Sequence, residues 1–161
     1  MDTGTVLSFL QEILFLIVVY GAFLMYTMMK GTQSLVNLTL ALYLALLISL
    51  KFPYYDMILG GAGSAKTESI LTIIVFVVFT LLSKWLFNRL MPPDSIESSF
   101  EYFGKKLLYA AGAAILVMAF SYHALPIAEL ITIGSPISYL FAPEANFFWW
   151  LLVPLVLLFL L

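Results

Sequence analysis

Val6–Leu50 decides the fold of this chain, and it reads VLSFLQEILFLIVVYGAFLMYTMMKGTQSLVNLTLALYLALLISL. Two long apolar runs are separated there by the charged, flexible pair Lys30-Gly31. A helix needs about 20 apolar residues to cross the roughly 30 Å hydrocarbon core of a bilayer. The runs Val6–Met29 and Ser34–Leu50 therefore predict two antiparallel transmembrane helices joined by a short turn.

The composition of the whole chain is typical of a membrane protein. Of its 161 residues, 63% are hydrophobic and 10% are charged, and the mean hydropathy is +1.08. In a typical soluble domain about a quarter of the residues are charged. We therefore expect an all-α integral membrane protein with a single transmembrane domain over residues 1–161.

Two further spans follow the first pair. The third predicted span covers Ser69–Leu90 and ends before Pro92-Pro93, and the fourth covers Lys106–Ala124 and ends before Pro126. Proline lacks the backbone N–H that a continuing helix needs, so it marks the end of each span. The sequence thus predicts a bundle of four transmembrane helices.

The C-terminal segment, residues 142–161, predicts a short fifth hydrophobic helix. Its uninterrupted apolar run, Phe147–Leu161, has 15 residues. As a helix this run is roughly 22 Å long, which is shorter than the hydrocarbon core. Pro154 disturbs it further. A tilted span and a half-inserted helix both remain open, and we prefer the span.

Basic residues in the short loops predict the orientation of the bundle, because cytoplasmic loops carry an excess of Lys and Arg. One side has two lysines, Lys51 and Lys66. The other side has five basic residues: Lys30, Lys84, Arg89, Lys105 and Lys106. The sequence therefore predicts that the second side is cytoplasmic and that the N-terminus lies outside.

The stretch GGAGSAKTES, residues 60–69, lies close to the phosphate-binding pattern G-x-x-x-x-G-K-[ST] but has Ala65 where the second glycine belongs. Such a loop follows a β-strand in nucleotide-binding proteins, whereas here a predicted transmembrane helix precedes it. We therefore expect no nucleotide site. Ser64 or Thr67 can cap the third span, and Glu68 is favourable in its first turn because of the helix dipole.

Several function classes are not indicated by the sequence. The net charge of −2 and the scattered basic residues make no patch for nucleic acid, and there is no cysteine. The single histidine has no Ser/Asp or Cys partner pattern, and no His/Asp/Glu cluster has metal-ligand spacing. We expect no enzyme activity, no cofactor and no metal.

Two ionisable residues within the predicted spans are candidates for an intramembrane polar site. Glu12 lies in the first span and His123 near the end of the fourth, both toward the predicted outer face. Charged groups inside a membrane are costly and are often functional, so a proton or cation site is one hypothesis. The alternative, which we favour, is that Glu12 lies in the headgroup layer and that His123 caps a helix.

Small and hydroxyl-bearing residues gather on two of the predicted spans. The fourth span has a candidate helix-packing face made of Ala110, Gly112, Ala113 and Ala114, which lets another helix approach closely within the chain or between copies. The third span has hydroxyls on one face: Ser69, Thr72, Thr80 and Ser83. Such hydroxyls can line a pore, but they more often bond their own helix or a neighbour.

Both long connectors have apolar residues at helical spacing. Between the third and fourth spans, Ile96, Phe100 and Phe103 predict either a short amphipathic interfacial helix or a solvated connector. After Pro126, the segment IAELITIGSPISYLF predicts a short surface-lying helix that is broken at Gly134-Ser135-Pro136.

The order of these parts resembles the colicin V production (CvpA) family of small bacterial inner-membrane proteins. The resemblance covers Leu14–Phe141 and lies in the motifs KGTQSLVNLTLALYLALL, KWLFNRL, FGKKLLYAAGAAILVMAF and LPIAELITIGSPISYLF. It implies a bacterial inner-membrane location and a role in envelope physiology or export. It implies no catalytic activity and no active residues.

We therefore expect a non-enzymatic polytopic membrane protein that acts by assembly, either as a homo-oligomer or with an envelope or export partner protein, in contact with the lipid bilayer. The alternative is a small transporter or channel component with a proton- or ion-linked polar site at Glu12 and His123.

Overall fold

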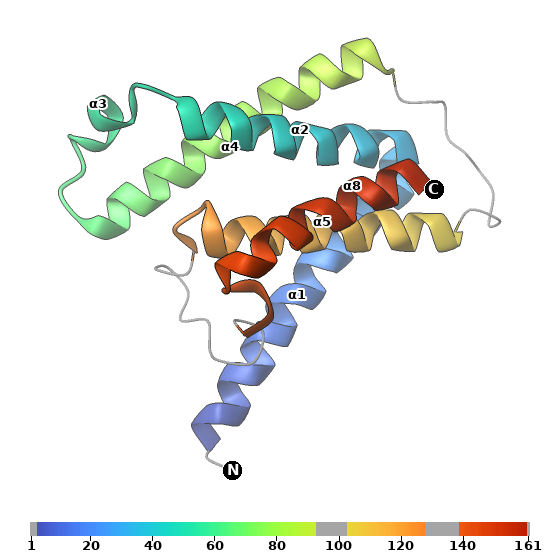
Figure 1. Ribbon diagram of the computed structural model, residues 1–161, viewed down its shortest axis with the longest axis horizontal. Coiled ribbons are helices and arrows are strands. Elements are labelled where there is room, and N and C mark those ends of the chain that lie inside the picture. Colours follow the sequence, from blue (N-terminus) through green and yellow to red (C-terminus); the bar gives the residue numbers. More distant parts are fainter. Residues whose placement is uncertain (1–2, 93–102, 128–138, 161) are drawn as a thin grey trace.

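The computed structural model describes residues 3–92, 103–127 and 139–160, and these residues are almost entirely helical. Within these ranges, four long helices and two shorter ones follow one another in order (Figure 1). They are α1 (Thr3–Lys30), α2 (Thr32–Lys51), α3 (Tyr55–Leu59), α4 (Ala65–Leu90), α5 (Phe103–His123) and α8 (Glu144–Leu160).

The predicted hairpin of the first two spans is present as α1 and α2, with a tighter turn than expected. Only Gly31 separates the two helices, and its backbone has a φ of 85°. L-residues with a side chain rarely adopt this left-handed conformation, so glycine is suited to the position. The Gly31 N–H donates to the carbonyl of Thr27 at 2.9 Å, which ends α1 with a satisfied backbone.

The stretch that resembles a phosphate loop forms the beginning of α4, as predicted. Ser64 is the N-cap, and its hydroxyl accepts a hydrogen bond from the Thr67 backbone N–H at 3.3 Å. Glu68 lies in the first turn. The cap places the start of the helix at Ala65, four residues before the predicted start at Ser69. The short helix α3, in the preceding connector, was not anticipated from the sequence.

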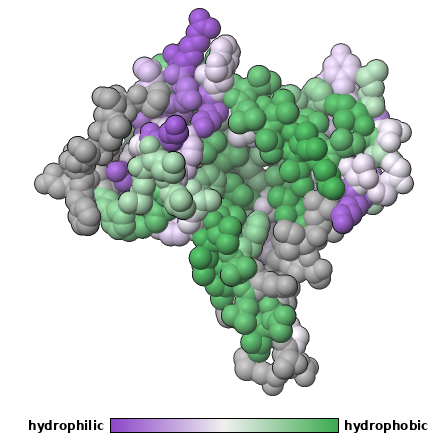
Figure 2. Space-filling view, turned by 180° about the vertical axis from the view of Figure 1, so that it is seen from behind, coloured by the Kyte–Doolittle hydropathy of each residue, from purple (hydrophilic) through white to green (hydrophobic). Residues whose placement is uncertain are grey.

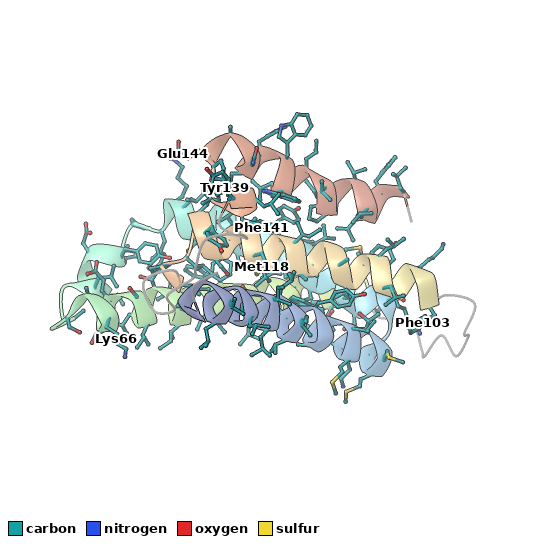
Figure 3. The ribbon with its side chains drawn as sticks, turned by 90° about the horizontal axis from the view of Figure 1, so that it is seen from below. Lys66, Phe103, Met118, Tyr139, Phe141 and Glu144 are labelled. Carbon is teal, nitrogen blue, oxygen red and sulfur yellow. The ribbon has the colours of Figure 1, made fainter. Side chains whose placement is uncertain are left out.

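Helix α5 is the centre of the described structure. It packs against α1, α2 and α8, whereas α4 packs against α2 and α3. Figure 3 shows α8 on one side of α5 and α1 on the other. Half of the α5 span is buried, compared with 6% of the α1 span and 11% of the α4 span. The remaining surface of α1 and α4 faces outward.

Aromatic and aliphatic side chains make the core where α2, α4 and α5 meet. Phe120 of α5 is 1% exposed, and its ring makes edge contacts with Phe76 of α4 and Tyr43 of α2. Around these rings lie the buried side chains of Leu42, Ala45, Leu46 and Leu116. These side chains are packed at the density that is typical of protein interiors, and their many close contacts together give a large dispersion attraction.

The C-terminal helix α8 is continuous through Pro154, which the sequence analysis expected to disturb it. It has 17 residues, or roughly 25 Å of helix, and begins at Glu144 rather than at residue 142. Pro154 is buried against α5. The packing against a neighbouring helix explains why the proline is tolerated, as it is in many transmembrane helices.

The fold class predicted from the sequence is confirmed. Within the described residues, four helices are long and apolar enough to cross a membrane: α1, α2, α4 and α5. Helix α8 is a shorter apolar helix. Figure 2 shows hydrophobic side chains over the middle of one face and along the projecting α1, with hydrophilic side chains toward the ends. The chain is a membrane protein by these features. The helices predicted in the connectors lie outside the described residues.

Candidate functional site

His123 ends α5 and joins it to the segment that begins α8. Its Nε2 donates to the carbonyl of Phe141 at 2.5 Å, which assigns the proton to that nitrogen. The imidazole also lies 4.4 Å from the Phe147 ring, centroid to centroid. His123 is therefore hydrogen-bonded to the C-terminal segment and packed against it, and the choice between a polar site and a helix cap stays a prediction.

Aromatic rings continue this contact between α5 and the C-terminal segment. Phe141 is buried and stacks on Trp150 at 4.5 Å and on Tyr122 at 6.1 Å. The Trp150 indole N–H donates to the Leu140 carbonyl at 2.8 Å. Figure 3 shows Phe141 next to Met118 of α5. The Trp150 indole ring therefore packs within the protein, on Phe141.

Glu12, the second candidate, belongs to α1, but its side chain lies outside the described residues. The following turn of α1 can be placed. Phe15 and Leu16 pack against Met118 and Ala119 of α5. Glu12 lies one turn before these residues in α1, and its predicted pairing with His123 remains a prediction.

The four small residues of the candidate helix-packing face, Ala110, Gly112, Ala113 and Ala114, are all buried. Ala110 and Ala113 pack with Leu35 of α2 and with aromatic residues of α1. A Cβ added to Gly112 would lie 3.3 Å from Leu157 Cδ1 and 3.7 Å from Pro154 Cα. The small residues allow three helices to approach α5 within one chain, so this face is not free for a second copy.

Tyr43 connects α2 to α8 next to Pro154. Its hydroxyl donates to the Leu151 carbonyl at 2.5 Å. A proline ring disturbs the backbone hydrogen bonds of the preceding turn of a helix. The Tyr43 hydroxyl supplies a donor to a backbone carbonyl of that turn. This contact was not predicted, because no sequence pattern links positions so far apart.

A polar network that the sequence analysis missed joins α2 to the end of α4. Asn37 is fully buried, and its Nδ2 donates to Asn88 Oδ1 at 3.0 Å and to the Met91 carbonyl at 2.8 Å. Gln33 Nε2 donates to Asn37 Oδ1 at 3.1 Å. A lone Asn within an apolar run was a signal for such a network, since buried amides require partners.

The third-span hydroxyls are satisfied mostly within α4 itself. Ser69, Thr72 and Thr80 each donate to the carbonyl four residues earlier, at 2.9 to 3.1 Å. Ser83 is 3% exposed, and its hydroxyl has no hydrogen-bond partner among the described residues. In lipid, such hydroxyls commonly donate to the backbone of their own helix, so these hydrogen bonds do not indicate a pore.

Within the described residues there is no group of three His, Cys, Asp or Glu side chains that could hold a metal ion. No protein-family model matches the chain, and no curated protein or solved structure is detectably similar to it.

Proposed function

We propose that the protein is a non-enzymatic membrane protein that acts by assembly, with further copies of itself or with an envelope or export partner. One observation carries this proposal: α1 and α4 each use a narrow side to contact the bundle and present a broad apolar surface outward. Large outward-facing apolar side chains, such as Leu14, Ile17 and Val18 on α1, cover that surface.

The positions of the small residues indicate which helix forms the assembly contact. The small-residue face of α5 is used within the chain, so a partner helix has to pack elsewhere, and α1 and α4 present broad apolar faces for it. On α1, Ala22 is exposed, and a Cβ added to the neighbouring Gly21 would have nothing within 4 Å. Small exposed residues let the backbone of another transmembrane helix come close. We infer that the partner helix packs against α1.

The bacterial inner-membrane location, the outside N-terminus and the envelope or export role belong to this proposal. They are supported by the five-to-two distribution of basic residues and by the resemblance to the colicin V production family. The transporter alternative receives less support, because the α4 hydroxyls donate within their own helix.

Single-cysteine cross-linking tests assembly directly, since the chain has no native cysteine. A22C on α1 and V78C on α4 place the thiol on outward faces, and A113C is a control because Ala113 is fully buried. We expect cross-linked dimers, or adducts with a copurifying protein, from A22C or V78C in native membranes, and none from A113C.

Absence of cross-links at both outward positions, together with a monomeric mass in a lipid nanodisc, would rule out assembly through α1 and α4. In that case aqueous thiol labelling of T72C, T80C and S83C would test the transporter alternative. Labelling of all three positions would indicate a water path along α4.

A further inference from the structure

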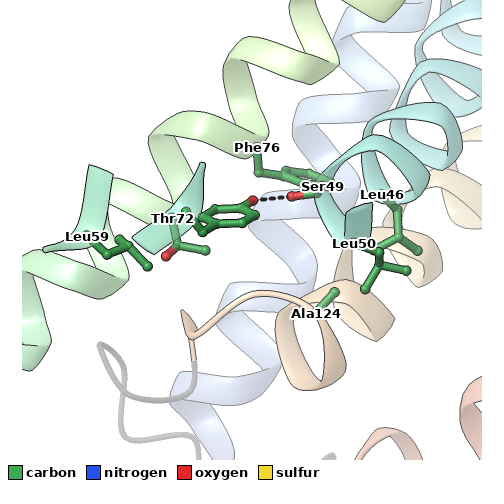
Figure 4. Close-up of a pocket in the computed structure, with 8 residues that line it drawn as sticks. Leu46, Ser49, Leu50, Leu59, Thr72, Phe76 and Ala124 are labelled. Carbon is green, nitrogen blue, oxygen red and sulfur yellow. Dashed lines mark hydrogen bonds between the residues drawn. The ribbon is translucent and has the colours of Figure 1, made fainter. Parts of the chain in front are cut away.

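A cavity opens between α4 and the end of α5, on the side of the bundle away from the α1–α2 turn. Helix α4 packs on α2 and α3, whereas α5 packs on α1, α2 and α8, which leaves a space between the two groups at this end. The cavity has a volume of about 330 Å³ and is lined by Leu46, Ser49, Leu50, Tyr55, Leu59, Thr72, Phe76 and Ala124 (Figure 4).

The lining connects the lipid-facing surface to the core. Leu50, at the rim, is 68% exposed, whereas Leu46 and Phe76 are 7% and 5% exposed. All three belong to helices that can span the membrane. The volume lies at the lower end of the roughly 300–1,000 Å³ that is usual for small-molecule sites. Leu50 is the penultimate residue of α2, so the rim lies near the end of a span, where the acyl chains of lipids meet their headgroups. An acyl chain can enter the cavity from there.

Hydroxyl groups are placed along this cavity. Ser49 Oγ and Tyr55 Oη are hydrogen-bonded to each other, as the dashed line in Figure 4 shows. Two hydroxyls that share one hydrogen bond retain a second O–H, which can donate to an ester carbonyl. Ester carbonyls lie between the acyl chains and the headgroup of a phospholipid, so a donor near the helix ends is suitably placed.

A second cavity adjoins the first and contributes a negative charge. It has a volume of about 260 Å³ and is lined by Ala65, Glu68, Ser69, Thr72 and Pro126. Thr72 lines both cavities. Glu68 is exposed and lies in the first turn of α4, at the end of the span. A carboxylate at this depth attracts an ammonium group and repels an anionic headgroup.

We propose that the two cavities bind one phospholipid with an ammonium-bearing headgroup. One acyl chain occupies the larger cavity as far as Phe76, the Ser49–Tyr55 pair donates to an ester carbonyl, and the headgroup amine lies beside Glu68. The proposal is independent of assembly through α1, because none of the lining residues belongs to that helix.

Photo-cross-linking of the unmodified protein tests occupancy. The protein is placed in nanodiscs that contain phosphatidylethanolamine with a diazirine on one acyl chain, and the labelled residues are mapped by mass spectrometry. We expect labels on the buried Leu46 and Phe76. A lipid in the surrounding bilayer reaches Leu47, which is 64% exposed, without entering the cavity. Labels on Leu47 but not on Leu46 or Phe76 would overturn the proposal.

A cavity-filling substitution tests the site itself. Thr72→Trp places an indole in the space that the two cavities share, and Val78→Trp places one on the outward face of α4 as a control. Native mass spectrometry then counts the phosphatidylethanolamine that stays bound after delipidation. We expect T72W to lower the bound fraction about fivefold or more and V78W to leave it unchanged. Equal retention by T72W and the unmodified protein would exclude the cavity as the binding site.

Headgroup preference tests the role of Glu68. The unmodified protein should retain phosphatidylethanolamine about three- to fivefold better than phosphatidylglycerol, as expected for an exposed charge pair. Glu68→Gln should remove this preference, and Glu144→Gln, a matched change at the start of α8, should not. If E68Q keeps the preference, the amine is not held by Glu68 and the proposed orientation of the lipid is wrong.

Discussion

At the scale of single residues, Gly112 and Tyr43 show how α8 is attached to the bundle. Gly112 leaves room for Pro154 and Leu157, and Tyr43 hydrogen-bonds the backbone of the turn before the proline. Both contacts concern the same short part of α8. A helix that contains proline can therefore remain continuous, because one neighbouring helix is shaped to fit it and another satisfies its backbone.

Substitution of Gly112 by leucine is expected to destabilise the attachment of α8. The Cβ alone would be 3.3 Å from Leu157, and the larger side chain must push α8 away from α5. We expect a loss of about 1–3 kcal/mol in the free energy of unfolding, measured by titration with a denaturing detergent. Gly104, on the same helix, has nothing within 4 Å of an added Cβ, so G104L should change stability by less than about 0.5 kcal/mol.

Substitution of Tyr43 by phenylalanine removes the hydroxyl and keeps the ring. We expect a cost of about 0.5–1.5 kcal/mol in the free energy of unfolding. If the hydroxyl acts by completing the backbone next to Pro154, the cost should shrink in a P154A background, where the turn can close its own hydrogen bonds. An equal cost in both backgrounds would show that the hydroxyl acts independently of the proline.

At the scale of elements, a polar contact joins α4 to α2 at one end of their interface. Asn37, fully buried, bonds both the Asn88 side chain and the Met91 carbonyl at the end of α4. Near the same end, the Lys84 ammonium lies 4.7 Å from the centroid of the Tyr26 ring of α1. The outer surface of α4 is free of such contacts with the rest of the described chain. The contact of Asn37 with Asn88 and Met91 therefore fixes the position of α4 along α2.

A double-mutant cycle on Asn37 and Asn88 measures this contact. Each single change to alanine should cost about 0.6–1.7 kcal/mol, the range measured for hydrogen bonds between transmembrane helices. The double variant should cost less than the sum of the two single variants, with a coupling of about 0.5 kcal/mol or more. Additive costs would mean that the Met91 carbonyl, and not Asn88, is the partner that matters to Asn37.

At the scale of the whole molecule, the charged ends of the helices determine how the bundle lies in the membrane. Lys30, at the end of α1, and Phe103, at the start of α5, flank one end of the bundle, and Lys66 lies at the other (Figures 1 and 3). The Asn37–Asn88 contact places the end of α4, with Arg89, at the Lys30 end. The basic residues that the orientation prediction grouped together therefore lie at the same end wherever the structure describes them.

Labelling with a membrane-impermeant maleimide tests the predicted orientation. G63C and G104C lie at opposite ends of the bundle, and at both glycines an added Cβ has nothing within 4 Å. In intact cells we expect G63C to be labelled and G104C to be protected, and both to be labelled after the membrane is permeabilised. The reverse pattern would place the N-terminus in the cytoplasm.

The sequence predicts those features of the structure that depend on residues close together in the chain. Apolar runs, Lys30-Gly31 and the Ser64 cap are local signals, and they were sufficient to predict the helices and the membrane location, because backbone hydrogen bonding in lipid must be satisfied within each helix. The start of α4 was misplaced by four residues, since a cap defines a helix start more sharply than hydrophobicity does. The short helix α3 gives no periodic signal in its five residues and was missed.

The sequence by itself therefore determined that this protein is an all-helical membrane protein and in which part of the chain each span lies. Only the tertiary structure decided that the small residues of α5 serve packing within the chain, that His123 and Tyr43 bind the C-terminal segment, and that one cavity lies beside Phe76 and a second beside Glu68. The physical reason is that these features join residues that are distant in the chain. The partner of each residue depends on which helices are neighbours, and neither hydropathy nor periodicity indicates this.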